Sequence, residues 1–450
     1  MTTTSLPRGP RLPRALQTAL MLYAGGWYVR TCRRFYGPTF TLRAATLGTM
    51  VYLSDPADIK TVFAGSPHIF HAGEANSMLK GLLGESSVLL ADGDGHRLRR
   101  RLMLAPFTRE AVEQQADVIA EVAAERISEW PVKQSFAAAP HMSAITLEVI
   151  LRTVIGASNP RRLAALREVM PRLLDVSAVD MLAVADPRLL RHRPWRRLRA
   201  AITEADGLLY AEIADHRADP DLSTRSDALA RLMTATDENG RGMSDAELRD
   251  QLMTLLVAGH DTTATGLCWA LERLTRDSVL LDKAARAAID GDDAFLDAVV
   301  AETLRVRPVV FDVGRVLKQP MMLAGHLLPA GVMVVPGMVL VHSDPRLYPD
   351  PARFDPVRML ESSPSPSTYL PFGGGNRRCL GATFASVEFR IVLSEILRRV
   401  ELQPTTDPGE RSRLRHVVFV PHRGARITVR ARRKGLPGAA EGSYAEVRTD

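Results

Sequence analysis

The stretch Pro371-Phe-Gly-Gly-Gly-Asn-Arg-Arg-Cys-Leu-Gly381 decides how this sequence is interpreted, and a helical pattern follows it directly, from Ala382 to Val400. The three consecutive glycines allow the backbone to turn tightly and to approach a flat ligand. Cys379 stands just before the N-terminus of the expected helix, where backbone N–H groups and the helix dipole stabilise an anion. The position therefore favours a thiolate over a thiol.

Three residues near this cysteine suit a thiolate that approaches a flat ligand. Arg377 and Arg378 add positive charge, and Phe372 supplies an aromatic wall. The residues alone also fit a glycine-rich loop that holds a buried structural cysteine. They do not match a phosphate-binding loop, because the Lys-Ser/Thr ending of that motif is missing.

The composition indicates a globular protein of a reducing compartment. Of the 450 residues 46% are apolar and 24% are charged, and the net charge is +7, which fits acidic proteins, anionic lipid or an anionic cofactor equally. Cys32, Cys268 and Cys379 are too few for a disulfide framework or a site of four thiolates. No segment has the roughly 20 apolar residues that span a bilayer. Residues 15–29 are expected to form a short amphipathic helix, with a peripheral membrane contact or a targeting role as the alternative.

Most of the chain has a helical pattern. Apolar residues recur at helical spacing in residues 108–130, 141–156, 160–178, 196–217 and 245–276. Short β-branched stretches predict strands at residues 39–42, 49–53, 416–420 and 426–429. The polar residues 218–243 are expected to form a loop. Because no linker divides the chain, we expect one mainly α domain with a minor β part over residues 1–432, with an extended segment at 1–14 and a disordered tail at 433–450.

The longest expected helix contains an unusual polar motif. Ser244 and Glu247 form a capping box at its start, and Ala258-Gly-His-Asp-Thr-Thr263 lies in its middle. An acid followed by hydroxyl residues is unfavourable inside an apolar helix, and Gly259 costs about 1 kcal/mol relative to alanine. Local rules that are broken together indicate function, although a helix kink with a solvated polar patch explains the motif equally well.

The cysteine loop resembles the haem-binding loop of the cytochrome P-450 superfamily. The matching positions are Phe372, Gly373, Gly375, Arg377, Cys379 and Gly381. The resemblance covers roughly residues 30–430 and implies the cytochrome P-450 fold, a single triangular helical domain, with haem b (iron protoporphyrin IX) as the cofactor. It implies that Cys379 is the axial ligand of the iron and that Phe372 packs beside it.

The other motifs acquire roles from the same resemblance. Ala258 and Gly259 would lie over the distal face of the haem, where the glycine leaves room for dioxygen. Asp261 and Thr262 match the acid–alcohol pair that delivers protons, whereas His260 occupies a variable position. The haem propionates would be bound by His96, Arg100, Arg315 and Arg377.

A structural triad is also implied. Glu302 and Arg305 match the Glu-x-x-Arg pair of the family, which is locked to an arginine of a later Pro-x-Arg-Phe segment. That segment is present as Pro351-Ala-Arg-Phe354, so Arg353 is expected to complete the triad.

The function implied by the resemblance is that of a bacterial, cytoplasmic haem-thiolate monooxygenase that hydroxylates a hydrophobic small molecule. It would use dioxygen and two electrons from a separate ferredoxin or flavodoxin with its NAD(P)H reductase, and neither nucleic acid nor a transmembrane anchor is expected. Arginines beside the cysteine loop and in residues 97–101 are expected to form the docking face for the electron donor. A peroxide-dependent oxidase and a haem-binding sensor or carrier without turnover remain alternatives.

Overall fold

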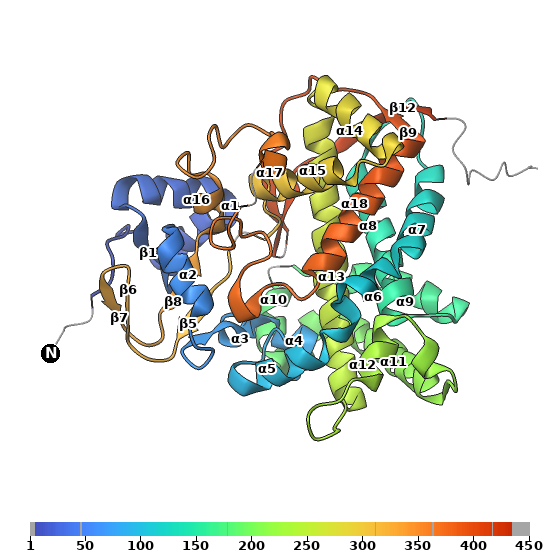
Figure 1. Ribbon diagram of the computed structural model, residues 1–450. Coiled ribbons are helices and arrows are strands. Elements are labelled where there is room, and N and C mark those ends of the chain that lie inside the picture. Colours follow the sequence, from blue (N-terminus) through green and yellow to red (C-terminus); the bar gives the residue numbers. More distant parts are fainter. Residues whose placement is uncertain are drawn as a thin grey trace, which may run out of the picture.

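The computed structural model describes residues 5–45, 47–177, 179–310, 312–361, 364–415 and 417–433. Helices from the middle of the chain form one side of the molecule, and a β-rich part with the N-terminal helix forms the other (Figure 1). The expected mainly α architecture with a minor β part is confirmed. All but the first residue of the expected disordered tail lies outside the described residues.

The helices have the following bounds. The α-helices are α1 (Arg14–Tyr36), α2 (Pro56–Ala64), α3 (Ala72–Ala75), α4 (Lys80–Leu83), α5 (Gly93–Leu102), α6 (Arg109–Glu113), α7 (Ala116–Ser128), α8 (Ala138–Ile150), α9 (Pro160–Leu174), α10 (Asp180–Ala185), α11 (Arg196–Ala218), α12 (Ala228–Thr234), α13 (Asp245–Leu274), α14 (Ser278–Asp290), α15 (Asp293–Val306), α16 (Met338–His342), α17 (Val357–Glu361) and α18 (Ala382–Arg399). Short 3-10 or π turns are η1 (Ser77–Leu79), η2 (Ala105–Phe107), η3 (Leu151–Ile155), η4 (Pro187–Arg191), η5 (Arg193–Trp195), η6 (Leu222–Thr224) and η7 (Gly375–Arg377).

The strands form two sheets and two hairpins. Their bounds are β1 (Thr39–Ala44), β2 (Gly48–Leu53), β3 (Phe70–His71), β4 (Ser135–Ala137), β5 (Arg315–Leu317), β6 (Met321–Leu323), β7 (His326–Leu328), β8 (Met333–Pro336), β9 (Val400–Leu402), β10 (Ser412–Arg415), β11 (Val418–Pro421) and β12 (Arg426–Arg432). The five-stranded sheet has the order β1-β2-β8-β5-β3, and β2 pairs with β8 in parallel. The order β4-β12-β9 makes the three-stranded sheet, while β6–β7 and β10–β11 are hairpins.

The central helix α13 organises the helical part. Its N-terminus has the expected capping box: the hydroxyl of Ser244 accepts from the N–H of Glu247, whose carboxylate accepts from the N–H of Ser244. At 1.5 Å per residue its 30 residues span about 45 Å. Two large apolar clusters pack against it from α7, α8, α15 and α18 and from α9 and α11. The helix is therefore held in place from several sides.

Several expected elements differ in detail from the structure. The expected helix 108–130 is two helices, α6 and α7, and the expected helix 141–156 begins at Ala138 and continues through the π turn η3 to Ile155. The loop predicted at residues 218–243 is wrong in part, because α12 lies inside it. Leu229 and Leu232 of that helix are fully buried, so tertiary packing outweighs the polar surroundings in the sequence.

The N-terminal segment from residue 5 to residue 13 has no helix or strand, as expected, and lies against the sheet. The carbonyl of Pro7 accepts from the hydroxyl of Thr41 at 2.8 Å, and the carbonyl of Arg8 accepts from the N–H of the same residue at 3.0 Å. β1 is an edge strand, so this segment covers an edge that would otherwise be free.

One stretch of the described residues, Ala138–Ile155, is long and apolar enough to cross a membrane by length and composition. It is formed by α8 and η3, and 67% of it is buried inside the molecule. Core helices pass the same test, which makes this weak evidence for a membrane span.

Candidate haem and oxygen site

The cysteine loop is folded tightly around Cys379. Gly373 and Gly375 have φ values of +65° and +64°, which residues with a Cβ rarely adopt. A Cβ on Gly375 would also overlap the carbonyl oxygen of Phe63 in α2. The N–H of Cys379 donates to the carbonyl of Phe372 at 2.8 Å, which closes the loop just before α18.

The sulfur of Cys379 is accessible although protein surrounds it. The side chain of Cys379 is exposed to solvent. The many protein atoms packed around it nevertheless desolvate the thiol and raise its pKa. The N–H of Gly381 and the charges of Arg378 and Arg100 act in the opposite direction and favour the thiolate. The arrangement therefore presents a single sulfur whose ionised form needs an additional positive partner, as a metal ion would provide.

The residues expected to bind the propionates converge in the structure. His96 and Arg100 come from α5, Arg315 from β5 and Arg377 from η7. Burial and the charges of the three arginines lower the pKa of His96 to about 3. Burial, followed by the charge of Arg377, lowers the pKa of Arg315 to about 10, and burial likewise lowers that of Arg377 to about 10.

Few acids balance these cations. Arg377 pairs with Asp92 at 2.5 Å and also donates to the carbonyl of Ala91. Asp92 was not singled out in the sequence, where nothing distinguishes it from other acids. Three guanidinium groups, with Asp92 as the one carboxylate paired with them in the part of the chain that the structure describes, form a site for an anionic group, and the two carboxylates of haem b fit this donor set.

The polar motif of α13 lies at a position where the helix is accessible. Ala258 is exposed in the middle of α13, between buried stretches of the helix, and Thr262 is partly exposed one turn later. The hydroxyl of Thr262 donates to the carbonyl of Ala258 at 2.8 Å. The accessible surface of α13 thus carries the hydroxyl expected to take part in proton delivery.

Packing against α8 explains why a glycine stands at position 259, and the sequence did not reveal this. A Cβ at this position would overlap Cδ1 of Ile150 in α8. The glycine therefore permits close packing of α8 on α13, and a methyl group there would point at α8. His260 is buried, with Nδ1 3.2 Å from the carbonyl of Leu256, in agreement with its structural interpretation.

Asp261 forms an ion pair that sequence reasoning missed. Its carboxylate accepts from Arg415 at the end of β10, and Asp261 is 9% exposed. The hairpin β10–β11 is attached to the same helix, because Nε1 of Trp269 donates to the carbonyl of Phe419 at 2.7 Å. The two partners are 154 residues apart in the sequence, so no local pattern links them.

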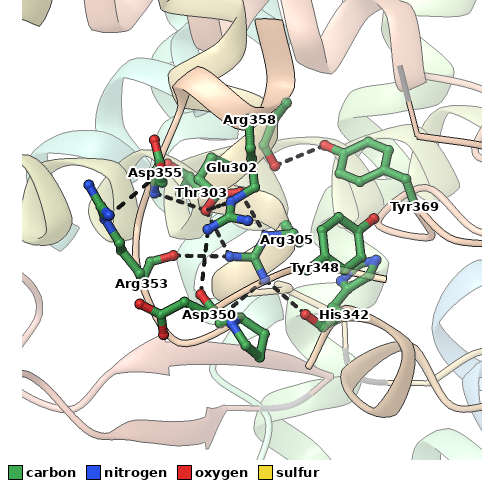
Figure 2. A network of polar contacts seen from close by, with 12 residues as sticks. Glu302, Thr303, Arg305, His342, Tyr348, Asp350, Arg353, Asp355, Arg358 and Tyr369 are labelled. Atoms are coloured by element: carbon green, nitrogen blue, oxygen red, sulfur yellow. Dashed lines mark hydrogen bonds and ion pairs between the residues drawn. The ribbon is translucent and has the colours of Figure 1, made fainter. Parts of the chain in front are cut away.

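The prediction of a structural triad of Glu302, Arg305 and Arg353 is wrong in one member. Glu302 and Arg305 form the expected pair, with two hydrogen bonds of 2.7 Å, and both are fully buried. However, the second guanidinium on Glu302 is that of Arg358, at 3.2 Å. Arg353 contributes its backbone carbonyl to Arg305, and its side chain, 68% exposed, turns toward Asp355 (Figure 2).

The sequence did contain a signal for this correction. Pro356-Val-Arg358 repeats the Pro-x-Arg pattern five residues after Pro351-Ala-Arg353. Only the second arginine is partly buried, with 15% of its side chain exposed. The two Pro-x-Arg patterns could not be ranked without knowing which one faces α15.

A second buried acid, Glu388 of α18, was also missed. It is 1% exposed, it lies near Thr263 of α13, and burial raises its pKa to about 8. One of its oxygens has no partner among the described residues. It therefore lies neutral beside the polar motif at pH 7.

Two surface hollows lie elsewhere. One of about 370 Å³ lies between α13, α14 and residues 353–357, and one of about 220 Å³ lies between α5 and the start of α13. Neither is lined by Cys379, Ala258 or Thr262, so the site rests on the chemistry of its residues.

Comparison with known proteins agrees with this chemistry. The Cytochrome P-450 family profile matches residues 7–429. A protein of Mycobacterium tuberculosis that carries the provisional name cytochrome P-450 135B1 is 65% identical over 434 residues, which are 95% of this chain and 92% of that protein. Cytochrome P-450 135A1 of the same species, also provisionally named, is 39% identical over 96% of this chain and 97% of that protein.

Solved structures share the fold. The retinoic acid-bound cyanobacterial protein CYP120A1 superposes with a TM-score of 0.82 at 24% identity, covering 94% of this chain and 99% of that chain. The haem domain of cytochrome P-450DA superposes with a TM-score of 0.79 at 22% identity, covering 96% and 98%. With the family profile and the mycobacterial relatives, these findings establish that the chain belongs to the cytochrome P-450 family, whose members are monooxygenases that bind haem b.

Proposed function

We propose that this protein hydroxylates a hydrophobic small molecule, using dioxygen and two electrons from a separate ferredoxin or flavodoxin with its NAD(P)H reductase. The observation that carries the proposal is the exposed thiol of Cys379 beside a cluster of three arginines, for which Asp92 is the one counter-ion among the described residues. When bound, haem supplies the activation of dioxygen, and a thiolate ligand favours cleavage of the O–O bond.

The residues of the chain would hold and orient the cofactor. Cys379 would ligate the iron, with Phe372, Gly373 and Gly381 shaping the loop around it. Arg100, Arg315 and Arg377, with His96, would bind the propionates. His96 stays neutral at pH 7, because burial and the neighbouring arginines lower its pKa, so it would contribute a hydrogen bond and no charge.

Proton delivery would use the polar motif of α13. Thr262 offers a hydroxyl whose own hydrogen bond to Ala258 fixes its direction. Asp261 is held by Arg415 and can accept a proton from solvent and pass it toward Thr262 when that ion pair opens. An oxygen carrier has no use for such a relay, and an oxidase that uses peroxide needs none.

The substrate and electron donor are inferred from the chemistry of the surface. Residues 71–90, 309–313 and 417–419, with Ala258, are mostly apolar and are proposed to line the substrate pocket. Residues 177–195 are apolar enough to be expected there too, but Val179, Leu182 and the arginines of that segment are exposed on the surface. Arg97 and Arg101 of α5 are 68% and 50% exposed, beside surface acids Asp94 and Glu238, and are proposed to face the donor. A cytoplasmic location accords with such a donor.

The experiment that tests the proposal replaces the ligand. Cys379→Ser should abolish the spectrum of the reduced, carbon monoxide-bound thiolate form and all NADPH-dependent product formation with a ferredoxin or flavodoxin system. Cys268→Ser, a buried cysteine on α13, is the control and should keep both. A parent protein that shows the thiolate spectrum but forms no product from any substrate that shifts its spin state would identify a sensor or carrier. Turnover only with hydrogen peroxide would identify the peroxide-dependent alternative.

A further inference from the structure

The net positive charge of the protein is concentrated in one segment. Residues 187–199, Pro-Arg-Leu-Leu-Arg-His-Arg-Pro-Trp-Arg-Arg-Leu-Arg, contain six arginines and no acid, while the whole chain has a net charge of +7. The segment comprises η4, η5 and the first turn of α11. We refer to it as the arginine segment.

All six arginines are exposed, and none forms an ion pair with an Asp or Glu in the part of the chain that the structure describes. Arg191 donates only to the ring of His192. This differs from the adjoining helices, where Arg162 and Arg172 of α9 pair with Glu212 and Glu204. Arg162 and Arg172 thus have acidic partners nearby, whereas the six arginines of the segment have none among the described residues.

The position of three of these arginines is unfavourable for the fold itself. Arg196, Arg197 and Arg199 occupy the first turn of α11, which contains no acidic residue. Cations near a helix N-terminus are destabilising, because they face the positive end of the helix dipole. Six like charges within thirteen residues also repel one another. The stability of the fold does not explain this arrangement, whereas binding of an anionic partner would.

Apolar side chains accompany the arginine segment on the surface. Val179 and Leu182 of the preceding turn and α10 are 58% and 56% exposed. Nε1 of Trp195 donates to the carbonyl of Val179 at 3.1 Å, so the apolar pair lies next to the arginines. Arginines combined with exposed aliphatic and aromatic residues suit an interface that is anionic at its surface and apolar beneath.

We propose that the arginine segment, with Val179 and Leu182, docks this protein onto anionic phospholipid membranes. The guanidinium groups would bind headgroup phosphates, and the two aliphatic side chains would enter the boundary with the acyl chains. Nucleic acid would satisfy the arginines but not the exposed aliphatic residues. The proposal does not depend on the reaction that the protein catalyses.

The test measures binding of the full-length holoprotein to vesicles by co-sedimentation. Vesicles of phosphatidylcholine alone should bind weakly, vesicles that also contain phosphatidylglycerol should bind well, and high salt should reverse the binding. Each arginine near an anionic surface contributes a factor of about five, so the triple variant Arg193→Gln, Arg196→Gln, Arg197→Gln should lose about a hundredfold in affinity. Leu182→Ser should lose about tenfold.

A matched control removes the same charge elsewhere. Arg161, Arg286 and Arg413 are exposed and have no acidic partner among the described residues, and their triple change to Gln should leave binding within about threefold of the parent. All variants should retain the haem content of the parent. An equal loss in the control would show that net charge alone drives binding and would overturn the proposal.

Two further outcomes would also overturn it. Loss of binding in Trp27→Ser, with binding kept in the arginine variant, would assign the contact to α1, where Trp27 is 60% exposed. Tight binding of an RNA oligonucleotide without binding of vesicles would assign the arginine segment to nucleic acid.

Discussion

Arg415 reaches the acid of the central helix from a strand far along the chain, and this contact gives the residue a role beyond packing. The ion pair with Asp261 fixes the carboxylate on one side of α13. The hairpin that carries Arg415 also contacts the segment proposed to line the substrate pocket, since the N–H of Phe419 donates to the carbonyl of Val309 at 2.8 Å. The position of the hairpin and the freedom of the acid are therefore coupled.

Arg415→Gln should uncouple NADPH use from product formation. Losing the guanidinium leaves Asp261 without a fixed orientation, so product per NADPH should fall up to about tenfold and hydrogen peroxide should rise. Asp261→Asn removes the acid itself and should cost roughly a hundredfold. Arg413→Gln, on the same strand and exposed, is the control. An unchanged product yield in Arg415→Gln, with the carbon monoxide spectrum intact, would contradict the positioning role.

Glu388 should make stability depend on pH. Its pKa is about 8 in the folded protein and ordinarily 4.5, so the unfolded chain releases this proton first as the pH rises. Its contribution is complete below pH 4.5 and is lost progressively up to about pH 8. Between pH 6 and 8 the free energy of unfolding should fall by about 2 to 3 kcal/mol from this group. Urea unfolding should show that Glu388→Gln lacks this part of the slope; equal slopes would exclude a buried neutral acid.

The residues of the site were predictable to different degrees. Cys379 and the loop around it form one contiguous motif, which the sequence displays in full. The partners Asp92, Arg415 and Arg358 were missed or misassigned, because each acts across the fold with a residue on a different element. Charged residues are common on any surface, and only the packing shows which of them is buried opposite another.

At the scale of elements, two helical glycines should respond in opposite ways to the same change. Gly207 in α11 has open space around it, so Gly207→Ala should stabilise the protein by about 0.5 to 1 kcal/mol through helix propensity. Gly259→Ala has the same gain but meets Ile150, and overpacking costs typically about 1 to 3 kcal/mol. Thermal unfolding of both variants measures the difference. Stabilisation by Gly259→Ala would mean that α8 moves away from the added methyl group with no loss of folding free energy.

Elements with a long repeating pattern were predictable, whereas short ones were not. α13 has a capping box and 30 residues of helical pattern, and its start was predicted. Strands β5 to β8 have three or four residues each, too few for a periodic signal. β8 exists because it pairs with β2, which lies almost 300 residues earlier in the chain. The junction of α8 with η3 is likewise invisible in composition.

At the scale of the whole molecule, the Glu302 network joins α15 to the long segment before the cysteine loop (Figure 2). Arg358→Met should lower the free energy of unfolding by about 3 kcal/mol, because it removes one of the two guanidinium groups from a fully buried carboxylate. Arg353→Met should stay within about 0.5 kcal/mol, since that side chain is exposed. Denaturant titration with a haem-loss assay compares them. Equal effects would restore the triad first expected.

The N-terminal segment of residues 5–13, which covers the edge strand β1, affects how the protein should be prepared in the laboratory. Shortening the chain to Arg14 would leave the amide of Thr41 without the carbonyl of Arg8 and would open the border of the five-stranded sheet. An open border invites a second molecule to add its own strand. The truncated protein should elute earlier in size-exclusion chromatography and precipitate on concentration. Purification tags are therefore better added before Met1 than put in place of residues 5–13.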